Sequence, residues 1–139
     1  MALFTTKNLQ FMNFLRYPDM EIEQGQATFI SGPSGSGKST LLKLFNGVAA
    51  PDGGEILYNG QYLASLDTIA LRREVLLVSQ AVYLFEGTIA ENFAIFHDYR
   101  GQPAPDEQEM RRCLDLCEAD FSTGAQAGTM SGGERQRVY

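Results

Sequence analysis

The chain has 139 residues, a formal net charge of −6 at pH 7 and an isoelectric point near 4.7. This acidic balance argues against broad attraction to nucleic acids or anionic membrane surfaces, because any polyanion would have to be held by a local cluster of donors. No apolar run reaches the roughly 20 residues that a membrane-spanning helix needs. We therefore expect a cytoplasmic globular domain that does not bind nucleic acid.

The first 30 residues carry the pattern of short β-strands. Apolar residues recur along this stretch and Gly25 predicts a turn, so the strands should present one apolar face to a core. The apolar positions are Leu3, Leu9, Phe11, Phe14, Met20 and Ile22. The run from Gln26 to Ser31 is also β-prone and predicts a further strand.

The next segment has the composition of a phosphate-binding loop, which places Gly, four residues and then Gly-Lys-Ser directly after a strand. Glycines can take a positive φ, so successive N–H groups can turn inward and form a nest of donors for phosphate oxygens. A plain Gly/Ser-rich turn is the alternative, but it does not require the flanking strand and helix. The residues are Gly32, Pro33, Ser34, Gly35, Ser36, Gly37, Lys38, Ser39 and Thr40.

A helix is predicted from about Gly37 to Gly47, with Leu41, Leu42, Leu44 and Phe45 on its apolar face. The N-terminus of a helix favours anions, because its N–H groups are unpaired and the helix dipole is positive there. Lys38 then supplies a charge to the β- and γ-phosphates, and the Ser39 hydroxyl is the expected ligand of Mg²⁺. The sequence therefore predicts binding of a nucleoside triphosphate with Mg²⁺.

Residues 51–80 are predicted to form a supporting hairpin and a short helix, followed by a strand that ends in a polar residue. Pro51–Gly54 is a turn, and the Asn-Gly pair within 55–62 predicts a hairpin. A short helix is expected over 66–74. The aliphatic run 76–80 predicts a strand that ends at the amide of Gln80.

The last third of the chain is predicted to be helical. One amphipathic helix is expected from Thr88 to Phe96 and another over 106–117, with apolar residues at helical spacing in the second: Met110, Cys113, Leu114 and Cys117. We expect the two cysteines to be reduced and packed. The predicted division is an ATP-binding part over 1–87 and a helical subdomain over 88–139.

The run from Met130 to Val138 reads Met-Ser-Gly-Gly-Glu-Arg-Gln-Arg-Val. Ser131 is a good N-cap, and two glycines let a backbone approach an anion closely, so the run fits a second phosphate clamp. A plain capped helix start is the alternative. Together with the phosphate loop, the run closely resembles the signature motif of ATP-binding cassette (ABC) ATPases, with Met in place of the usual leading Leu.

The resemblance extends over nearly the whole chain and implies an α/β fold of the P-loop NTPase class. It implies an N-terminal antiparallel β region, a parallel-sheet core that is incomplete in this chain, and a helical subdomain. Gln80 then resembles the glutamine of the family's Q-loop, a ligand of Mg²⁺ or of the attacking water, and 85–93 resembles cassettes of exporter type. An aromatic residue that stacks on adenine is implied in the β region, where Phe11, Phe14 and Tyr17 are candidates, each of them also a candidate core residue.

The resemblance also implies partners. In the family, two nucleotide-binding domains pair head to tail, and the signature of one closes on the γ-phosphate held by the other. The residues expected to act in this way are Ser131, Gly132, Gly133, Glu134 and Gln136. A transmembrane subunit is expected to contact residues 82–93, which would hold the domain at the inner face of the cell membrane.

The family's pattern continues beyond the signature into the Walker B strand with its Asp-Glu end, a D-loop and a switch histidine, and none of these is among the 139 residues. The Glu is the general base that orients water on the γ-phosphate. We therefore expect a truncated domain whose catalytic residues are Lys38 and Gln80 alone and which hydrolyses ATP poorly. The alternatives are an inactive nucleotide-binding fragment and an ABC-type ATPase that serves no transporter.

Overall fold

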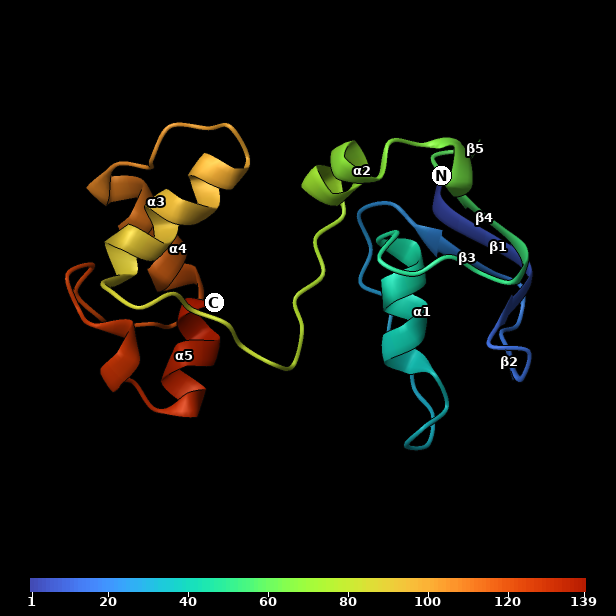
Figure 1. Cartoon of the computed structure of the whole chain (residues 1–139), viewed down its shortest axis with the longest axis horizontal. Helices are drawn as coiled ribbons and strands as arrows, with labels where there is room; N and C mark the ends of the chain where they lie inside the picture. Colours follow the sequence, from blue (N-terminus) through green and yellow to red (C-terminus); the bar gives the residue numbers. More distant parts are fainter. The chain divides into compact units, whose positions relative to one another are not determined.

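The computed structural model describes the whole chain, from Met1 to Tyr139. The chain forms two compact units, Met1–Val78 and Ser79–Tyr139 (Figure 1). The second unit therefore begins before Thr88, because the segment that precedes this residue is hydrogen-bonded to the helices that follow it.

The first unit contains a five-stranded sheet in which every pairing is antiparallel. The order is β2-β1-β4-β5, and β3 also pairs with β1. At its centre, Thr6 of β1 lies opposite Met20 on one side and Ile56 on the other. The strands are β1 (Ala2–Phe11), β2 (Leu15–Arg16), β3 (Met20–Glu23), β4 (Gly53–Tyr58) and β5 (Gln61–Tyr62).

The inward face of β1 changes along the strand. Phe4 and Thr6 are buried as the period of two requires, but Leu9 is the next buried residue. Between them Asn8 has a φ of 50°, and the register with β4 shifts between Lys7 and Gln10. This irregularity has the character of a β-bulge, which re-aims the strand so that an odd-numbered residue reaches the core.

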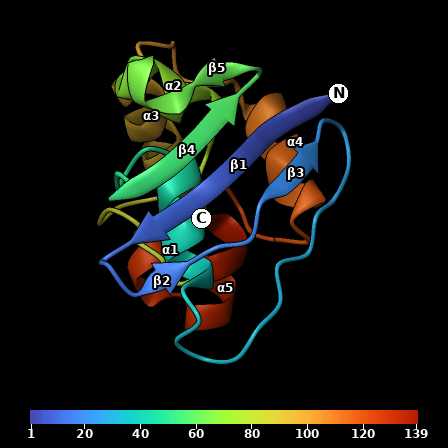
Figure 2. The ribbon, with the colours of Figure 1, turned by 90° about the vertical axis from the view of Figure 1, so that its right-hand side faces the viewer.

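Helix α1 (Lys38–Phe45) packs behind this sheet, as Figure 2 shows. The rings of Phe4 and Phe45 lie 4.8 Å apart. A short 3₁₀ helix, η1 (Leu63–Ser65), and helix α2 (Thr68–Glu74) complete the unit, and Asp67 caps α2 by accepting the N–H of Ile69. The buried residues shared by these elements are Phe4, Leu9, Leu41, Leu44, Phe45, Ile56, Leu63 and Leu71.

The second unit consists of helices: α3 (Ile89–Tyr99), α4 (Glu107–Leu116), the 3₁₀ helix η2 (Ala127–Thr129) and α5 (Gly132–Val138). Its core is built on Ile89, Leu114 and Ala119. Met110 and Leu114 are buried as expected, but Cys113 and Cys117 are exposed. The expectation of packed cysteines was therefore wrong, because the buried stripe of α4 is narrower than the apolar spacing indicated.

The parallel-sheet core expected from the resemblance is not present in the structure, where both segments predicted as its strands lack a hydrogen-bonded neighbour. Residues 26–31 and 76–80 form no strand. Phe29 is 94% exposed and Val78 is 72% exposed. Composition favours strands in these segments, but a strand forms only where a partner accepts and donates its backbone hydrogen bonds. No helix of the chain has the length and apolar character to cross a membrane.

Candidate phosphate-binding site

The loop between residue 31 and α1 turns through glycines with positive φ. Gly35 and Gly37 have φ values of 80° and 87°, a region that L side chains adopt only with strain. The N–H of Ser36 donates to the carbonyl of Pro33 at 3.3 Å, which closes the turn. Gly37 is the N-cap of α1 and has no side-chain oxygen, so it leaves the helix N-terminus open.

Lys38 spans the loop. Its ammonium donates hydrogen bonds to the carbonyl oxygens of Gly32 and Pro33, both at 2.8 Å. These bonds place the positive charge next to the start of the loop, where the strand-like segment ends. The loop therefore curls around the charge that the sequence assigns to the β- and γ-phosphates.

Several backbone N–H groups of the loop have no acceptor within the chain. None of the backbone hydrogen bonds uses the N–H of Gly35, Gly37, Lys38 or Ser39. A helix N-terminus of this kind stabilises anions, because unpaired donors and the dipole act together. The side chain of Ser39 is exposed beside them. This set of N–H donors therefore fits a polyphosphate, and the Ser39 hydroxyl can be a ligand of the Mg²⁺ that accompanies it.

The structure separates the three candidates for adenine stacking. Phe14 is 71% exposed in the turn between β1 and β2. Phe11 is half-buried and packs against the core of the first unit. Tyr17 also packs there, and its hydroxyl donates to the carbonyl of Gly37 at 3.0 Å. Phe14 is therefore the candidate whose ring face is accessible.

Gln80 lies in the second unit, and the phosphate loop lies in the first. Its side chain is exposed. The neighbouring hydroxyl of Ser79 donates to the carbonyl of Ala81 at 2.6 Å and so shapes the turn in which Gln80 lies. The assignment of Gln80 to Mg²⁺ remains a prediction.

The signature segment forms an exposed helix start. The Ser131 hydroxyl accepts the N–H of Glu134 at 3.4 Å, and the Glu134 carboxylate accepts the N–H of Ser131 at 2.7 Å, which is a capping box. Hydrogen bonds from the hydroxyl and the N–H of Ser131 lower the pKa of Glu134. Gly132 and Gly133 are exposed, as is Gln136. The backbone of this elbow is therefore accessible to a ligand.

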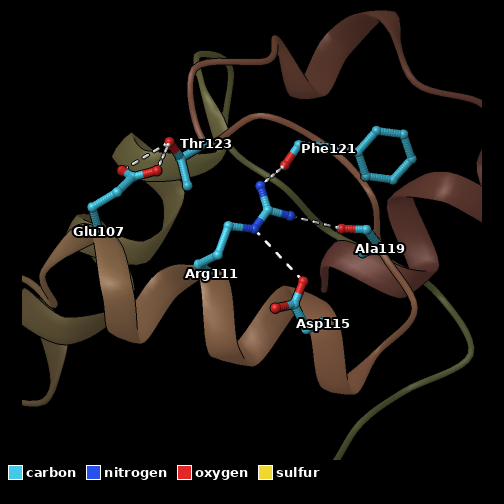
Figure 3. A network of polar contacts seen from close by, with 6 residues as sticks. All are labelled: Glu107, Arg111, Asp115, Ala119, Phe121 and Thr123. Atoms are coloured by element: carbon cyan, nitrogen blue, oxygen red, sulfur yellow. Dashed lines mark hydrogen bonds and ion pairs between the residues drawn. The ribbon is translucent and has the colours of Figure 1, made fainter.

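The loop that leads to the signature is held by α4 (Figure 3). The guanidinium of Arg111 donates to the carbonyls of Phe121 at 2.6 Å and Ala119 at 3.4 Å, and it lies 3.6 Å from Asp115. The hydroxyl of Thr123 donates to Glu107 at 2.8 Å. The sequence does not reveal this network, because a carbonyl acceptor in a loop does not depend on the type of its residue's side chain.

The same loop contacts the start of α3 and the last turn of α5. The carbonyls of Ala125 and Thr123 accept the N–H groups of Ile89 and Ala90 at 3.0 and 2.8 Å. On the other side, the guanidinium of Arg137 in α5 lies 5.8 Å from the centre of the Phe121 ring. Residues 119–125 therefore contact all three α-helices of the second unit.

Comparison with known proteins identifies the family. The sequence pattern of the family described as "ABC transporter" matches residues 15–139, from β2 to the end of the signature helix. The chain belongs to the ABC transporter family. The matched part is its ATP-binding domain, the ATPase component of the family.

Individual ABC relatives are similar over most of this chain. It is 38% identical over 128 residues to the mycobactin import ATP-binding/permease protein IrtB of Mycolicibacterium smegmatis, which covers 84% of this chain and 21% of the relative. It is 39% identical over 136 residues to the sulfate/thiosulfate import ATP-binding protein CysA of Caulobacter vibrioides, covering 90% of this chain and 40% of the relative. It is 37% identical over 120 residues to ABC transporter I family member 17 of Arabidopsis thaliana, covering 86% and 45%.

A solved ABC structure has the same fold. A bacterial Atm1-family ABC exporter with ATP bound aligns with a TM-score of 0.82 and 29% identity, over 97% of this chain and 26% of that chain. The chain thus spans less than half the length of these ABC relatives.

Proposed function

We propose that this domain binds ATP with Mg²⁺ through residues 32–40 and thereby drives a membrane transporter. The observation that carries the proposal is the set of unpaired loop N–H groups beside the Lys38 ammonium. When ATP enters, its phosphates would accept those N–H groups and compete with the carbonyls of Gly32 and Pro33 for Lys38. Mg²⁺ would be held by the hydroxyl of Ser39, and Gln80 is proposed as a further ligand of the ion.

Adenine recognition is assigned to Phe14. Its exposed ring offers a face to a base, and the Met12 side chain in the same turn is also exposed. Stacking on an aromatic ring suits adenine because every base has a π-face, and truncation of such a ring costs about 1–3 kcal/mol per base in single-strand binding proteins. Phe11 and Tyr17 are committed to packing in the first unit.

The signature is proposed to act on the nucleotide of a second domain. Ser131, Gly132 and Gly133 are exposed and lie at a helix start, the position where N–H groups favour an anion. A head-to-tail pair would then contain two ATP molecules, each between one loop and the partner's signature. ATP would stabilise the closed pair because it binds that state more tightly than the open one.

An exposed aromatic cluster supports a transmembrane partner. Tyr83 is 63% exposed and Tyr99 is 69% exposed, and both rings lie near Phe85, at 5.0 and 6.1 Å. This cluster overlaps residues 82–93, where the membrane subunit is expected. IrtB combines the two parts in one "ATP-binding/permease" chain, whereas CysA is named as an "ATP-binding protein". Contact with a membrane subunit would place the domain at the cytoplasmic face of the membrane.

Hydrolysis is proposed for the paired domains within a transporter. Lys38 and Gln80 supply charge and orientation, but neither is a carboxylate base that could take a proton from water. We therefore expect the 139-residue chain alone to bind ATP and to turn it over slowly.

The test is a calorimetric titration of the chain with MgATP. Lys38→Ala should abolish binding, because the β- and γ-phosphates lose their charged partner. Lys43→Ala is the matched control, since Lys43 lies exposed in the last turn of the same helix. Equal affinity of the Lys38→Ala variant and the unaltered chain would contradict the assignment of the loop.

A further inference from the structure

Tyr17 connects the antiparallel sheet with the phosphate loop. Its N–H donates to the carbonyl of Leu9 in β1 at 3.0 Å, which fixes its backbone at the edge of the sheet. Its ring is half-buried against the core, and its hydroxyl donates to the Gly37 carbonyl at 3.0 Å. The side chain therefore has a defined position between two elements that are distant in sequence.

Gly37 is the point where the loop becomes a helix. Its carbonyl also accepts the first helical hydrogen bond, from the N–H of Leu41 at 2.8 Å. A Cβ at Gly37 would lie 2.7 Å from the Tyr17 hydroxyl and 3.1 Å from a methyl group of Leu15. The tyrosine hydroxyl thus occupies the space that any other residue at 37 would need.

The peptide unit between Gly37 and Lys38 links this contact to phosphate binding. The unit is planar and trans, so the carbonyl of Gly37 and the N–H of Lys38 point in opposite directions. Because Tyr17 and Leu41 hold the carbonyl on one side, the Lys38 N–H is directed to the other. That N–H has no acceptor within the chain.

The hydroxyl of Tyr17 remains a donor at neutral pH. Burial raises the pKa of Tyr17 above its ordinary value of 10.0, and a hydrogen bond with the Thr40 side chain opposes this shift. Thr40 lies in the first turn of α1, next to Ser39. Tyr17 therefore contacts the loop at its last glycine and the helix at its first turn.

We propose that Tyr17 is a positioning residue for phosphate binding, which aims the Lys38 N–H at the nucleotide by holding the Gly37 carbonyl. The residue touches no part of the ATP. This inference rests on the proposed function, because it requires that residues 32–40 bind phosphate. It assigns Tyr17 to the triphosphate end of the site and leaves the base to Phe14.

Tripolyphosphate is the probe that separates these roles, because it carries the phosphates of ATP without the base. Tyr17→Phe removes the hydroxyl and keeps the ring. The variant should raise the Kd for MgATP and for tripolyphosphate alike, by roughly three- to tenfold, as expected for one neutral hydrogen bond. Tyr62→Phe is the control, since Tyr62 is exposed in β5 and should leave both affinities unchanged.

The outcomes distinguish the two proposals. If Lys38→Ala abolishes binding of both probes and Tyr17→Phe leaves both Kd values within about 1.5-fold, the role of Tyr17 is overturned and the function of the loop stands. Weaker ATP binding with unchanged tripolyphosphate binding would assign Tyr17 to the base and also overturn the role. If the unaltered chain binds neither probe, both proposals fall.

A measurement on the unaltered chain does not depend on how the variant folds. Amide exchange observed by NMR should show protection of the Lys38 N–H when tripolyphosphate is added, with Lys43 as an internal reference in the same helix. An unprotected Lys38 amide at saturating tripolyphosphate would overturn the proposal.

Discussion

The side chain of Asn92 forms hydrogen bonds with both the N–H and the carbonyl of Phe85. Its Oδ1 accepts the N–H of Phe85 at 2.8 Å, and its Nδ2 donates to the carbonyls of Phe85 at 3.1 Å and Thr88 at 2.9 Å. Asn92 is only 3% exposed. This contact attaches the segment after Ser79 to α3 and explains why the helical unit begins before the first residue of that helix.

Asn92→Leu should destabilise the second unit. The change leaves the N–H and carbonyl of Phe85 without partners in a partly buried place, and each unsatisfied group costs roughly 1–3 kcal/mol. Urea unfolding followed by helical circular dichroism would measure the loss. Gln108→Leu makes a comparable change at an exposed position of α4 and should have little effect; equal midpoints for the two variants would contradict the role of Asn92.

Arg111→Met should also destabilise the second unit, because the carbonyls of Ala119 and Phe121 lose a charged donor (Figure 3). Hydrogen bonds to charged groups contribute about 1.5–3 kcal/mol, and we expect the lower end because the Arg111 side chain is 36% exposed. Arg112→Met is the matched control on the next, exposed position. The same urea titration would show a shift for Arg111→Met alone; a shift of equal size in both variants would mean that the loop does not depend on this contact.

The helix caps predict a loss of stability in acid. Hydrogen bonds from the backbone N–H of Thr88, and next from its hydroxyl, lower the pKa of Glu91, and Ser131 lowers the pKa of Glu134. A carboxylate whose folded pKa is depressed stabilises the fold above its ordinary pKa of 4.5, and this contribution disappears as the pH falls through the lowered value. Unfolding midpoints should therefore be level from pH 7 to about 5 and fall below pH 4.5.

Glu91→Gln tests this assignment, because the amide keeps the shape of the side chain and does not titrate. The Glu91→Gln variant should lose less stability between pH 5 and pH 3 than the unaltered chain. Glu86→Gln, at an exposed loop position, is the control and should lose as much stability as the unaltered chain. An acid transition that is the same in all three proteins would exclude Glu91 as its source.

Local chemistry was readable from the sequence, and pairing between distant segments was not. The loop glycines, the N-cap at Ser131 and the hairpin after Gly54 depend on neighbours within a few residues, so residue types predict them. The strands predicted over 26–31 and 76–80 depend on partners elsewhere in the chain, and composition carries no information about whether a partner is present. In the antiparallel region the β1–β2 and β4–β5 hairpins bring their own partners, and both partners of the long-range β1–β4 pairing are present in the chain.

The same distinction explains the site. Lys38 and Ser131 belong to motifs in which every residue type has a chemical reason, and their roles toward ATP remain predictions. In the structure, Lys38 bonds to two loop carbonyls and Ser131 caps α5. Tyr17 is predicted from the sequence as a stacking or core residue, and nothing in the sequence shows that its hydroxyl reaches a carbonyl twenty positions further on. Contacts to backbone carbonyls leave no sequence pattern.

A mixing experiment tests the proposal that the signature of each domain contacts the ATP bound by the other. Lys38→Ala removes the loop charge of one chain, and Ser131→Arg blocks the elbow of the other with a bulky cation. In a head-to-tail pair of the two variants, one interface combines both defects, but the other combines an intact loop with an intact signature. Each variant alone has a defect at both interfaces.

Light scattering with MgATP should therefore show monomers for each variant alone and dimers for the equimolar mixture, with about one ATP bound per pair. The expectation follows because ATP stabilises only the pairing in which both of its contacts are made. Lys43→Ala alone is the control for the charge change, and it should form ATP-dependent dimers as the unaltered chain does, since Lys43 lies outside the loop. ATP-dependent dimers of Ser131→Arg alone, as abundant as those of the unaltered chain, would exclude the signature from the contact between domains.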